Sequence, residues 1–316
     1  MIVAGIDEAG YGPRLGPLVV AASAFRLEEG VKEPALNRLL AVSGTGGGLP
    51  INDSKLLYHG PETFGVLETS VLGHAVLARG VLPLRVRALL EVAVDFHADE
   101  VEELPWYSQR LLPTPLPRRA TVDEILQRAA RQGELLSDRG LQFVGFWAAP
   151  IPEPRFNHLT RSRGSKAWPL FLAAGRLIDT LMASFPRDEL LVRVDRHGGR
   201  ARYGDLLAHY FPLAPIRTVR ETEQQSSYRC DFPDRPPVRI EFEVGGDGRR
   251  APVALASVVA KTVRELFMES LNSWFAERVP GVRRTAGYNQ DSHRFLRDVA
   301  SAIHDESIAS RLIRVR

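Results

Sequence analysis

The chain has 316 residues, 44% hydrophobic and 25% charged, which is typical of a soluble globular protein with a sizeable core. Its formal net charge is +3, from 41 lysines and arginines against 38 acidic residues, so a polyanionic partner is permitted but not required. A single cysteine, Cys230, excludes an intramolecular disulfide, and no run approaches a membrane span, so we expect a cytoplasmic protein without membrane segments.

Strand-like and helical patterns alternate along most of the chain. Apolar residues in extended runs predict strands, and apolar residues at three- and four-residue spacing predict helices. Thr121 followed by Glu124 has the pattern of a helix-capping box. We expect strands at 2–6, 18–22, 141–151 and 189–194, helices at 61–78, 83–95, 121–138, 167–184 and over most of 252–316, and irregular chain at 97–120 and 279–290.

Between 201 and 244 we expect a short helix and two extended segments, the second over 238–244. The alternation of this second segment places Ile240, Phe242 and Val244 on one face and its two glutamates on the other. Strands that alternate with helices predict an α/β domain whose sheet is covered by helices.

Three acidic sites follow strand-like runs: Asp7 with Glu8, then Asp195, then Asp247. Carboxylates at the ends of neighbouring strands converge on one edge of a sheet, where they repel one another unless they are protonated or bound to a cation. Hard oxygen ligands suit Mg²⁺ or Mn²⁺, and two such ions can clamp a phosphodiester for in-line displacement by water. The same residues also fit turns and caps on a solvated edge, and periodicity does not decide between the two readings.

Adjacent side chains of a regular strand point to opposite faces, so Asp7 and Glu8 cannot both reach a metal from one. We therefore expect Glu8 to lie where the strand ends, because Gly10 and Gly12 permit unusual dihedral angles. The chain has no cysteine cluster of zinc-site spacing and no glycine-rich phosphate loop ending in Gly-Lys, so those chemistries lack their simplest motifs.

Five segments in the same order resemble ribonuclease HII. The first is Gly-Ile-Asp-Glu-Ala-Gly-Tyr-Gly-Pro at 5–13, continuing as Gly-Pro-Leu-Val-Val-Ala-Ala at 16–22. The others are Asp53-Ser54-Lys55, the strand-terminal Val194-Asp195, Asp247 with the helix at 256–264 that carries Ser257 and Lys261, and Gly287-Tyr288 followed by His293.

The resemblance implies an α/β fold, a ribonuclease H-like mixed sheet flanked by helices, with a helical C-terminal segment and inserted elements. It implies a catalytic domain over 1–264, with an insertion at about 80–140 and an added hairpin at about 215–244. The remaining residues, 265–316, are then a helical segment packed on that domain.

The resemblance also implies the chemistry. Asp7, Glu8, Asp195 and Asp247 would hold two Mg²⁺ or Mn²⁺ ions, and the enzyme would cut the RNA strand of RNA–DNA hybrids, or ribonucleotides embedded in duplex DNA. The products carry 5′-phosphate and 3′-hydroxyl ends. We expect a monomer whose further substrate-binding residues, some of them reading the ribose 2′-hydroxyl, are Gly10, Tyr11, Gly12, Lys55, Ser257, Lys261 and Tyr288.

Some of these residues have a plainer interpretation. Tyr288 also fits an aromatic side chain that anchors the C-terminal helices, Lys55 also fits a solvated surface, and His293 fits a structural role better than a catalytic one. The basic cluster of Arg161, Arg163 and Lys166 fits either a phosphate site or a solvated surface.

The chain departs from the family pattern in its turn and in its spacing. Tyr11 stands where the family has an arginine between the two glycines, which puts any phosphate contact of that guanidinium in question. The intervals of 142 residues from Asp53 to Asp195 and of 52 from Asp195 to Asp247 are long, which is why the insertion and the hairpin are placed there.

Three other functions remain open from the sequence. One is a ribonuclease HIII-like preference for continuous hybrids over single embedded ribonucleotides. Another is a non-cleaving hybrid-binding protein on the same fold, although all four acids are present. The third is a metal-dependent phosphotransferase for small molecules, which would leave the glycine turn and Tyr288 without a role.

Overall fold

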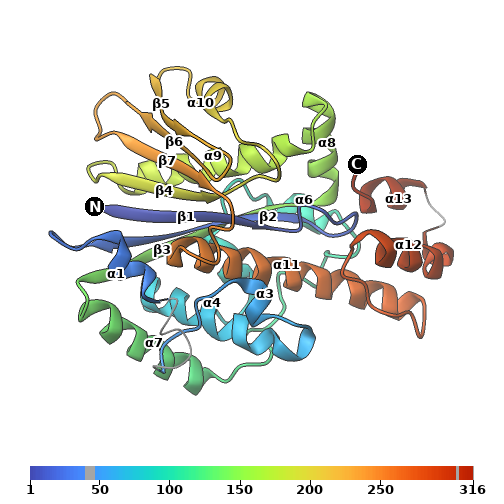
Figure 1. Ribbon diagram of the computed structural model, residues 1–316. Coiled ribbons are helices and arrows are strands. Elements are labelled where there is room, and N and C mark those ends of the chain that lie inside the picture. The colour runs from blue at the N-terminus through green and yellow to red at the C-terminus, as the bar shows by residue number, and fades with distance from the viewer. Residues whose placement is uncertain (40–46, 304–305, 316) are drawn as a thin grey trace.

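The computed structural model describes residues 1–39, 47–303 and 306–315, and these form one seven-stranded mixed sheet flanked by helices (Figure 1). In spatial order the strands are β3 (Leu141–Ile151), β2 (Leu18–Leu27), β1 (Ile2–Ala9), β4 (Leu190–Asp195), β7 (Val238–Glu243), β6 (Gln225–Cys230) and β5 (Ile216–Glu221). Strand β2 is antiparallel to β1 and β3, β4 is parallel to β1 and β7, and β6 is antiparallel to β5 and β7. The expected α/β class is confirmed.

Helices cover both faces of the sheet, and each layer has its own apolar core (Figure 1). On one face lie α1 (Glu33–Asn37), α3 (Ser54–Leu57), α4 (Phe64–Arg79), α7 (Val122–Ser137) and α11 (Ala251–Arg278). On the other lie α8 (Glu153–Arg163), α9 (Ala167–Ser184) and α10 (Gly204–Tyr210). Shorter or peripheral helices are α5 (Val86–Leu89), α6 (Ala98–Glu102), α12 (Asn289–Asp298) and α13 (Glu306–Leu312).

The central strand β1 is buried on both faces, which explains its continuous apolar sequence. Ile2, Ala4 and Ile6 pack in the core beneath α9, whereas Val3 packs in the core beneath α11. The side chain that follows Ile6 therefore points towards the α11 layer.

Gly5 allows the long helix α11 to begin directly against β1. A Cβ atom at this position would lie 2.2 Å from the backbone carbon of Pro252, in the first turn of the helix. On the next strand, Ser23 Oγ donates a hydrogen bond to the Pro252 carbonyl oxygen at 2.7 Å. The start of α11 is thus held on the sheet beside the end of β1.

Two expected elements differ from the structure. The helix predicted over 83–95 is reduced to α5 and a 3₁₀ turn at Leu90–Val92. Conversely, no helix was expected over 153–163, where Pro152 and Pro154 follow directly after β3, but the structure forms α8 there. Pro154 instead occupies the first turn of α8, where the missing amide hydrogen costs nothing.

The glutamates of β7 lie on the face opposite Ile240 and Phe242, as expected, whereas Val244 lies beyond the end of the strand and is exposed. Glu241 and Glu243 are buried, and both accept hydrogen bonds from the guanidinium of Arg193 on β4. Arg193 also binds Glu33 of α1. A charge network thus replaces apolar packing here, because buried carboxylates require a paired cation.

The capping box at Thr121 begins α7, where the Thr121 hydroxyl accepts a hydrogen bond from the Glu124 amide at 3.3 Å.

In the predicted hairpin region, β5 and β6 extend the sheet beyond β7. The boundary expected at 264/265 falls inside α11, which runs without a break from Ala251 to Arg278. Within the described residues, no helix combines the length and apolarity needed to cross a bilayer.

Candidate metal centre

Strand register brings Asp7 and Asp195 together. The parallel strands β1 and β4 place Ile6 beside Val194, so the next residues of the two strands are neighbours on the same face. One carboxylate oxygen from each of Asp7, Glu8 and Asp195 lies within 4.8 Å of the other two. These three side chains form the carboxylate cluster.

Glu8 joins the cluster as the penultimate residue of β1, close to the end of the strand where it was expected. β1 continues to Ala9, and its pairing with β2 includes Glu8 beside Val20. Pairing with β4, however, ends at Ile6. The side of β1 that faces β4 is therefore open at Glu8, which lets the longer glutamate side chain reach the two aspartates.

Asp247 borders the cluster from the turn between β7 and α11. The amide of Gly246 donates to Asp195 Oδ1 at 2.7 Å, which fixes this turn against the end of β4. Asp247 itself accepts from the Gly248 amide at 3.0 Å and from Lys55 Nζ at 3.3 Å. Its oxygens are not among those within the 4.8 Å group, so it lies at the margin of the cluster.

Burial raises the pKa of each cluster carboxyl. Burial, and then the charges of Glu8 and Asp195, raise the pKa of Asp7 well above its ordinary value. Burial and the charge of Asp195 raise the pKa of Glu8 to about 7. The pKa of Asp195 rises to about 6, chiefly through burial, with a further contribution from Asp247. The ionised cluster is therefore unfavourable without a cation nearby.

A hard divalent cation fits these donors. Within the described residues, Glu8 Oε2 is buried without a hydrogen-bond partner, so one ligand oxygen is available. The cluster offers carboxylate oxygens and no imidazole or thiolate, which favours Mg²⁺ or Mn²⁺ over zinc.

The Asp53-Ser54-Lys55 segment is held beside α11. The side chain of Asp53 caps α3 by accepting from the Lys55 amide at 2.8 Å, and Ser54 Oγ lies 3.0 Å from Ser257 Oγ. A hydrogen bond from Ser257 also opposes the rise in the pKa of Asp7, whose largest cause is burial. Lys55 and Ser257 thus both lie next to the acids, and 81% of the Lys55 side chain is exposed.

The glycine turn at 10–12 is braced by two buried arginines. Gly10 has a φ of +86°, and a Cβ atom there would lie 2.3 Å from Arg264 Nε. The guanidinium of Arg314 donates to the carbonyl oxygens of Gly10 and Tyr11. Gly12 is exposed, with no other atoms near the position of a Cβ, so its backbone is open to a ligand.

Tyr288 lies on the same side of the molecule because its neighbour is hydrogen-bonded to the N-terminal loop. The amide of Arg14 donates to the Gly287 carbonyl oxygen at 2.8 Å. The Arg264 guanidinium lies 5.6 Å from the Tyr288 ring, which is 48% exposed. His293 contacts Arg14 and is not part of the carboxylate cluster.

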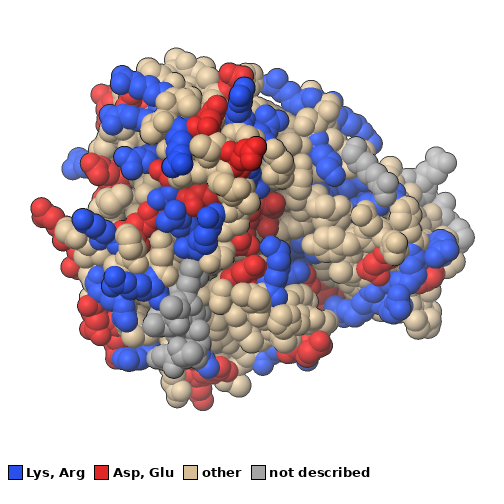
Figure 2. All heavy atoms as spheres, viewed as in Figure 1, with Lys and Arg blue, Asp and Glu red and all other residues tan. Residues whose placement is uncertain are grey.

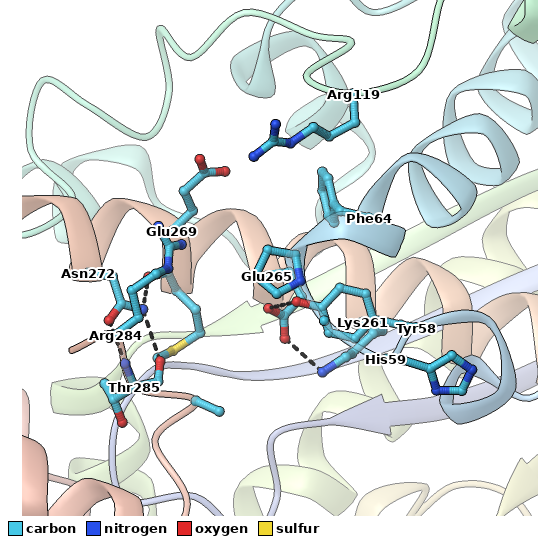
Figure 3. Close-up of a pocket in the computed structure, with 14 residues that line it drawn as sticks. Tyr58, His59, Phe64, Arg119, Lys261, Glu265, Glu269, Asn272, Arg284 and Thr285 are labelled. Atoms are coloured by element: carbon cyan, nitrogen blue, oxygen red, sulfur yellow. Dashed lines mark hydrogen bonds and ion pairs between the residues drawn. The ribbon is translucent and has the colours of Figure 1, made fainter.

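Lys261 faces a separate pocket of about 410 Å³ beside α11 (Figure 3). Its ammonium donates to Glu265 Oε1 at 2.7 Å and lies 4.6 Å from the ring of Tyr58, whose hydroxyl also binds Glu265. Figure 3 shows Arg284 and Thr285 on the opposite wall of this pocket. The charge of Lys261 is therefore paired within the pocket instead of facing the acids.

The sequence interpretation missed Arg264, Arg314 and Lys166 as neighbours of the turn. Arg264 had a usable signal, because it lies three residues after Lys261 on the same helix. Arg314 had none, since it is joined to the turn only by tertiary structure.

Figure 2 shows acidic side chains in the hollow near the middle of the face that is turned to the viewer, with basic side chains along the borders of the hollow.

No family model matches the sequence, and no curated protein matches it. Solved structures are similar to the chain at low identity. A ribonuclease HII in complex with PCNA, from Archaeoglobus fulgidus, has 17% identity and a TM-score of 0.47, covering 100% of this chain and 95% of its own. Bst ribonuclease HIII in complex with Mn²⁺ has 14% identity and a TM-score of 0.42, and the match covers 100% of this chain and 66% of the other. Ribonuclease H2 from Pyrococcus horikoshii has 14% identity and a TM-score of 0.41, and the match covers 96% of this chain and 90% of the other.

Proposed function

We propose that the protein is a metal-dependent ribonuclease of the type 2 ribonuclease H family that cuts the RNA strand of RNA–DNA hybrids, or ribonucleotides embedded in duplex DNA. The observation that carries the proposal is the meeting of three carboxylates from two distant parts of the chain within 4.8 Å, directly before the glycine turn and with Asp247 at their margin. A solvated sheet edge would not need to bury Asp7 beside two further acids.

Asp7, Glu8, Asp195 and Asp247 would hold two Mg²⁺ or Mn²⁺ ions. Such ions supply activation of water and stabilisation of the leaving 3′ oxygen of the scissile phosphodiester. Lys55 orients Asp247 through its ion pair, and Gly246 orients Asp195 through its amide hydrogen bond. Ser257 donates to Asp7, which favours the ionised form that binds cations.

The glycine turn and Tyr288 would distinguish RNA from DNA. The ribose 2′-hydroxyl is both a donor and an acceptor, so backbone groups of an exposed turn can bind it. Gly12 presents such backbone without a side chain, and Gly10 adopts a conformation that other residues rarely adopt. Tyr288 is exposed enough to stack on a sugar or base.

The test is incubation with labelled duplexes that contain no, one or many ribonucleotides, in Mg²⁺ and in Mn²⁺. We expect no cutting of the all-DNA duplex and cutting at ribonucleotides, with 3′-hydroxyl and 5′-phosphate ends. The ratio between the single-ribonucleotide and continuous-hybrid substrates separates a ribonuclease HII-like from a ribonuclease HIII-like preference. Tight binding of hybrids without turnover in either metal would instead identify a hybrid-binding protein.

A further inference from the structure

A second cavity, of about 380 Å³, lies beside Tyr11 and apart from the carboxylate cluster. Three cationic side chains line it, those of Arg14, Lys166 and Arg314. None of the described residues that line this cavity is acidic. A concave surface with several cations and no carboxylate favours binding of an anion.

Arg314 is the fixed cation of this cavity. Its side chain is 2% exposed, and its two terminal nitrogens donate to the backbone of the glycine turn. Burial, and then the charge of Arg264, lower the pKa of Arg314 to about 9. The charge of Glu153 opposes this effect, and burial raises the pKa of Glu153 itself to about 7. Because the pKa of Arg314 stays above neutral pH, this side chain adds a positive charge to the wall of the cavity.

Lys166 and Arg14 are the two cations of the cavity that solvent reaches, unlike the buried Arg314. The Lys166 ammonium lies 5.5 Å from the centre of the Tyr11 ring and makes no ion pair with a carboxylate of the described residues. Arg14 contacts the imidazole of His293, which is a neutral or cationic partner rather than a carboxylate. Both side chains are half-buried, so an anion between them would be partly shielded from water.

We propose that this cavity holds one backbone phosphate of the nucleic-acid substrate, bound by Lys166 and Arg14 on the Tyr11 side of the turn. The proposal rests on the proposed function, because it assigns a second contact, to a backbone phosphate, to the same nucleic acid that the site would cut. A phosphodiester fits the site better than a larger anion, since it carries one charge and presents two oxygens to two cations. Tyr11 itself is uncharged. The two cations are Lys166, which lies between α8 and α9, and Arg14, which lies in the loop after the turn.

The test is the salt dependence of binding. Affinity for a labelled duplex with one ribonucleotide is measured at several sodium chloride concentrations, by fluorescence anisotropy, in an Asp7→Asn background that blocks cutting. Each phosphate contact of duplex DNA contributes about 0.9 to the slope of log affinity against log salt. We expect Lys166→Ala to make the slope less steep by about that amount and to weaken binding several-fold, whereas Lys166→Arg retains the slope.

Arg131→Ala is the matched control, because Arg131 is an exposed arginine on α7, paired with Glu134. It should leave the slope unchanged. Lys166→Gln guards against a folding defect at the start of α9, and it should reproduce the alanine result at an unchanged melting temperature. An unaltered slope in a folded Lys166→Ala or Lys166→Gln protein overturns the proposal.

The two proposals fail separately. If the parent protein cuts ribonucleotides but the Lys166 variants keep the parental slope, only the phosphate site is wrong. If the parent protein cuts nothing yet the slope changes at Lys166, the nuclease assignment is wrong and the phosphate site is retained. A change seen with inorganic phosphate but not with duplexes would assign the cavity to a free anion and overturn the substrate contact.

Discussion

Arg314 Nη2 donates a hydrogen bond to the carbonyl oxygen of Tyr11 at 3.1 Å, although 303 residues separate the two in the chain. The same guanidinium binds the Gly10 carbonyl oxygen and lies 3.7 Å from the centre of the Phe156 ring on α8. The C-terminal segment thus fixes the backbone of the turn that we propose reads the ribose. This one side chain therefore links the C-terminal segment to the turn that is proposed to bind the substrate.

Replacement of Arg314 with methionine should therefore impair both properties. Two charge-assisted hydrogen bonds are lost and two carbonyl groups lose a partner, so we expect the free energy of unfolding to fall by about 3 kcal/mol. The catalytic efficiency on a single-ribonucleotide duplex should fall further than the efficiency on a continuous hybrid, if the turn positions the ribose. Urea unfolding and steady-state kinetics measure the two effects.

Arg314→Lys is the informative companion, because lysine keeps the charge but lacks the planar fork that reaches both carbonyls. It should remain impaired. The metal-induced rise in melting temperature should survive in both variants, since Arg314 does not contact the carboxylate cluster. Parental stability in Arg314→Met would contradict the bracing role.

Asp7→Asn should abolish cutting while the fold is retained. The amide has nearly the volume of the carboxyl group, but it removes a charged ligand from the cluster. Without metal the variant should be at least as stable as the parent, because burial and two neighbouring acids already disfavour the Asp7 carboxylate. Differential scanning fluorimetry should show the Mg²⁺-induced rise in melting temperature reduced or absent.

Asp123→Asn, at an exposed position on α7, is the control for loss of an aspartate charge as such. It should keep both the cutting activity and the metal-induced shift. Near-parental cutting by Asp7→Asn would remove this residue from the site.

The acids of the site were predictable because apolar runs end at them. The runs before Asp7 and Asp195 predict two strands, and parallel pairing of those strands then makes the aspartates neighbours. Whether the acids bind metal was not decided by periodicity, and the assignment of their roles came from resemblance and stays a prediction. The approach of Glu8 depended on where pairing with β4 stops, which no local pattern records.

The misjudged elements share a cause, which is that tertiary partners override local pattern. Alternation placed the glutamates of β7 on one face, but it did not show that Arg193 on the next strand pairs with Glu241 and buries it. Pro154 follows closely on the strand expected at 141–151, yet it lies in the first turn of α8. Arg314 carries no local signal at all, because its function depends on two backbone carbonyls at the other end of the chain.

Stability without metal should fall as the pH rises from about 4 to about 7. Burial holds the pKa of Glu8 near 7 and that of Asp195 near 6, above their ordinary values of 4.5 and 3.8. The native state therefore keeps protons that the unfolded chain has released, so this contribution is full below the ordinary values and lost as the pH passes through the raised ones. Mg²⁺ should bind more tightly across the same range.

The measurement is the melting temperature against pH, in chelator and in Mg²⁺, for the parent and for Glu8→Gln. The difference between the two proteins isolates Glu8 from the many surface carboxylates that titrate at lower pH. In chelator, Glu8→Gln should gain stability relative to the parent as the pH rises. A difference that does not vary with pH would mean that the native pKa of Glu8 is ordinary.

Gly5→Ala should be strongly destabilising, because the new methyl group would lie 2.2 Å from backbone atoms of Pro252 and Val253. Backbone cannot rotate away as a side chain can, so α11 must shift off β1, at a cost of about 3 kcal/mol. The shift would also move Ser257 away from Ser54, so the metal-induced rise in melting temperature should shrink.

Gly199→Ala is the matched control, since a methyl group there meets no atom within 4 Å and should change stability by less than about 0.5 kcal/mol. Chemical denaturation gives the first effect, and fluorimetry with and without Mg²⁺ gives the second. If Gly5→Ala lost stability but kept the full metal response, the contact between β1 and α11 would support the fold without positioning the site. Loss of both stability and metal response would mean that the close contact between β1 and α11 at Gly5 also positions the carboxylate cluster.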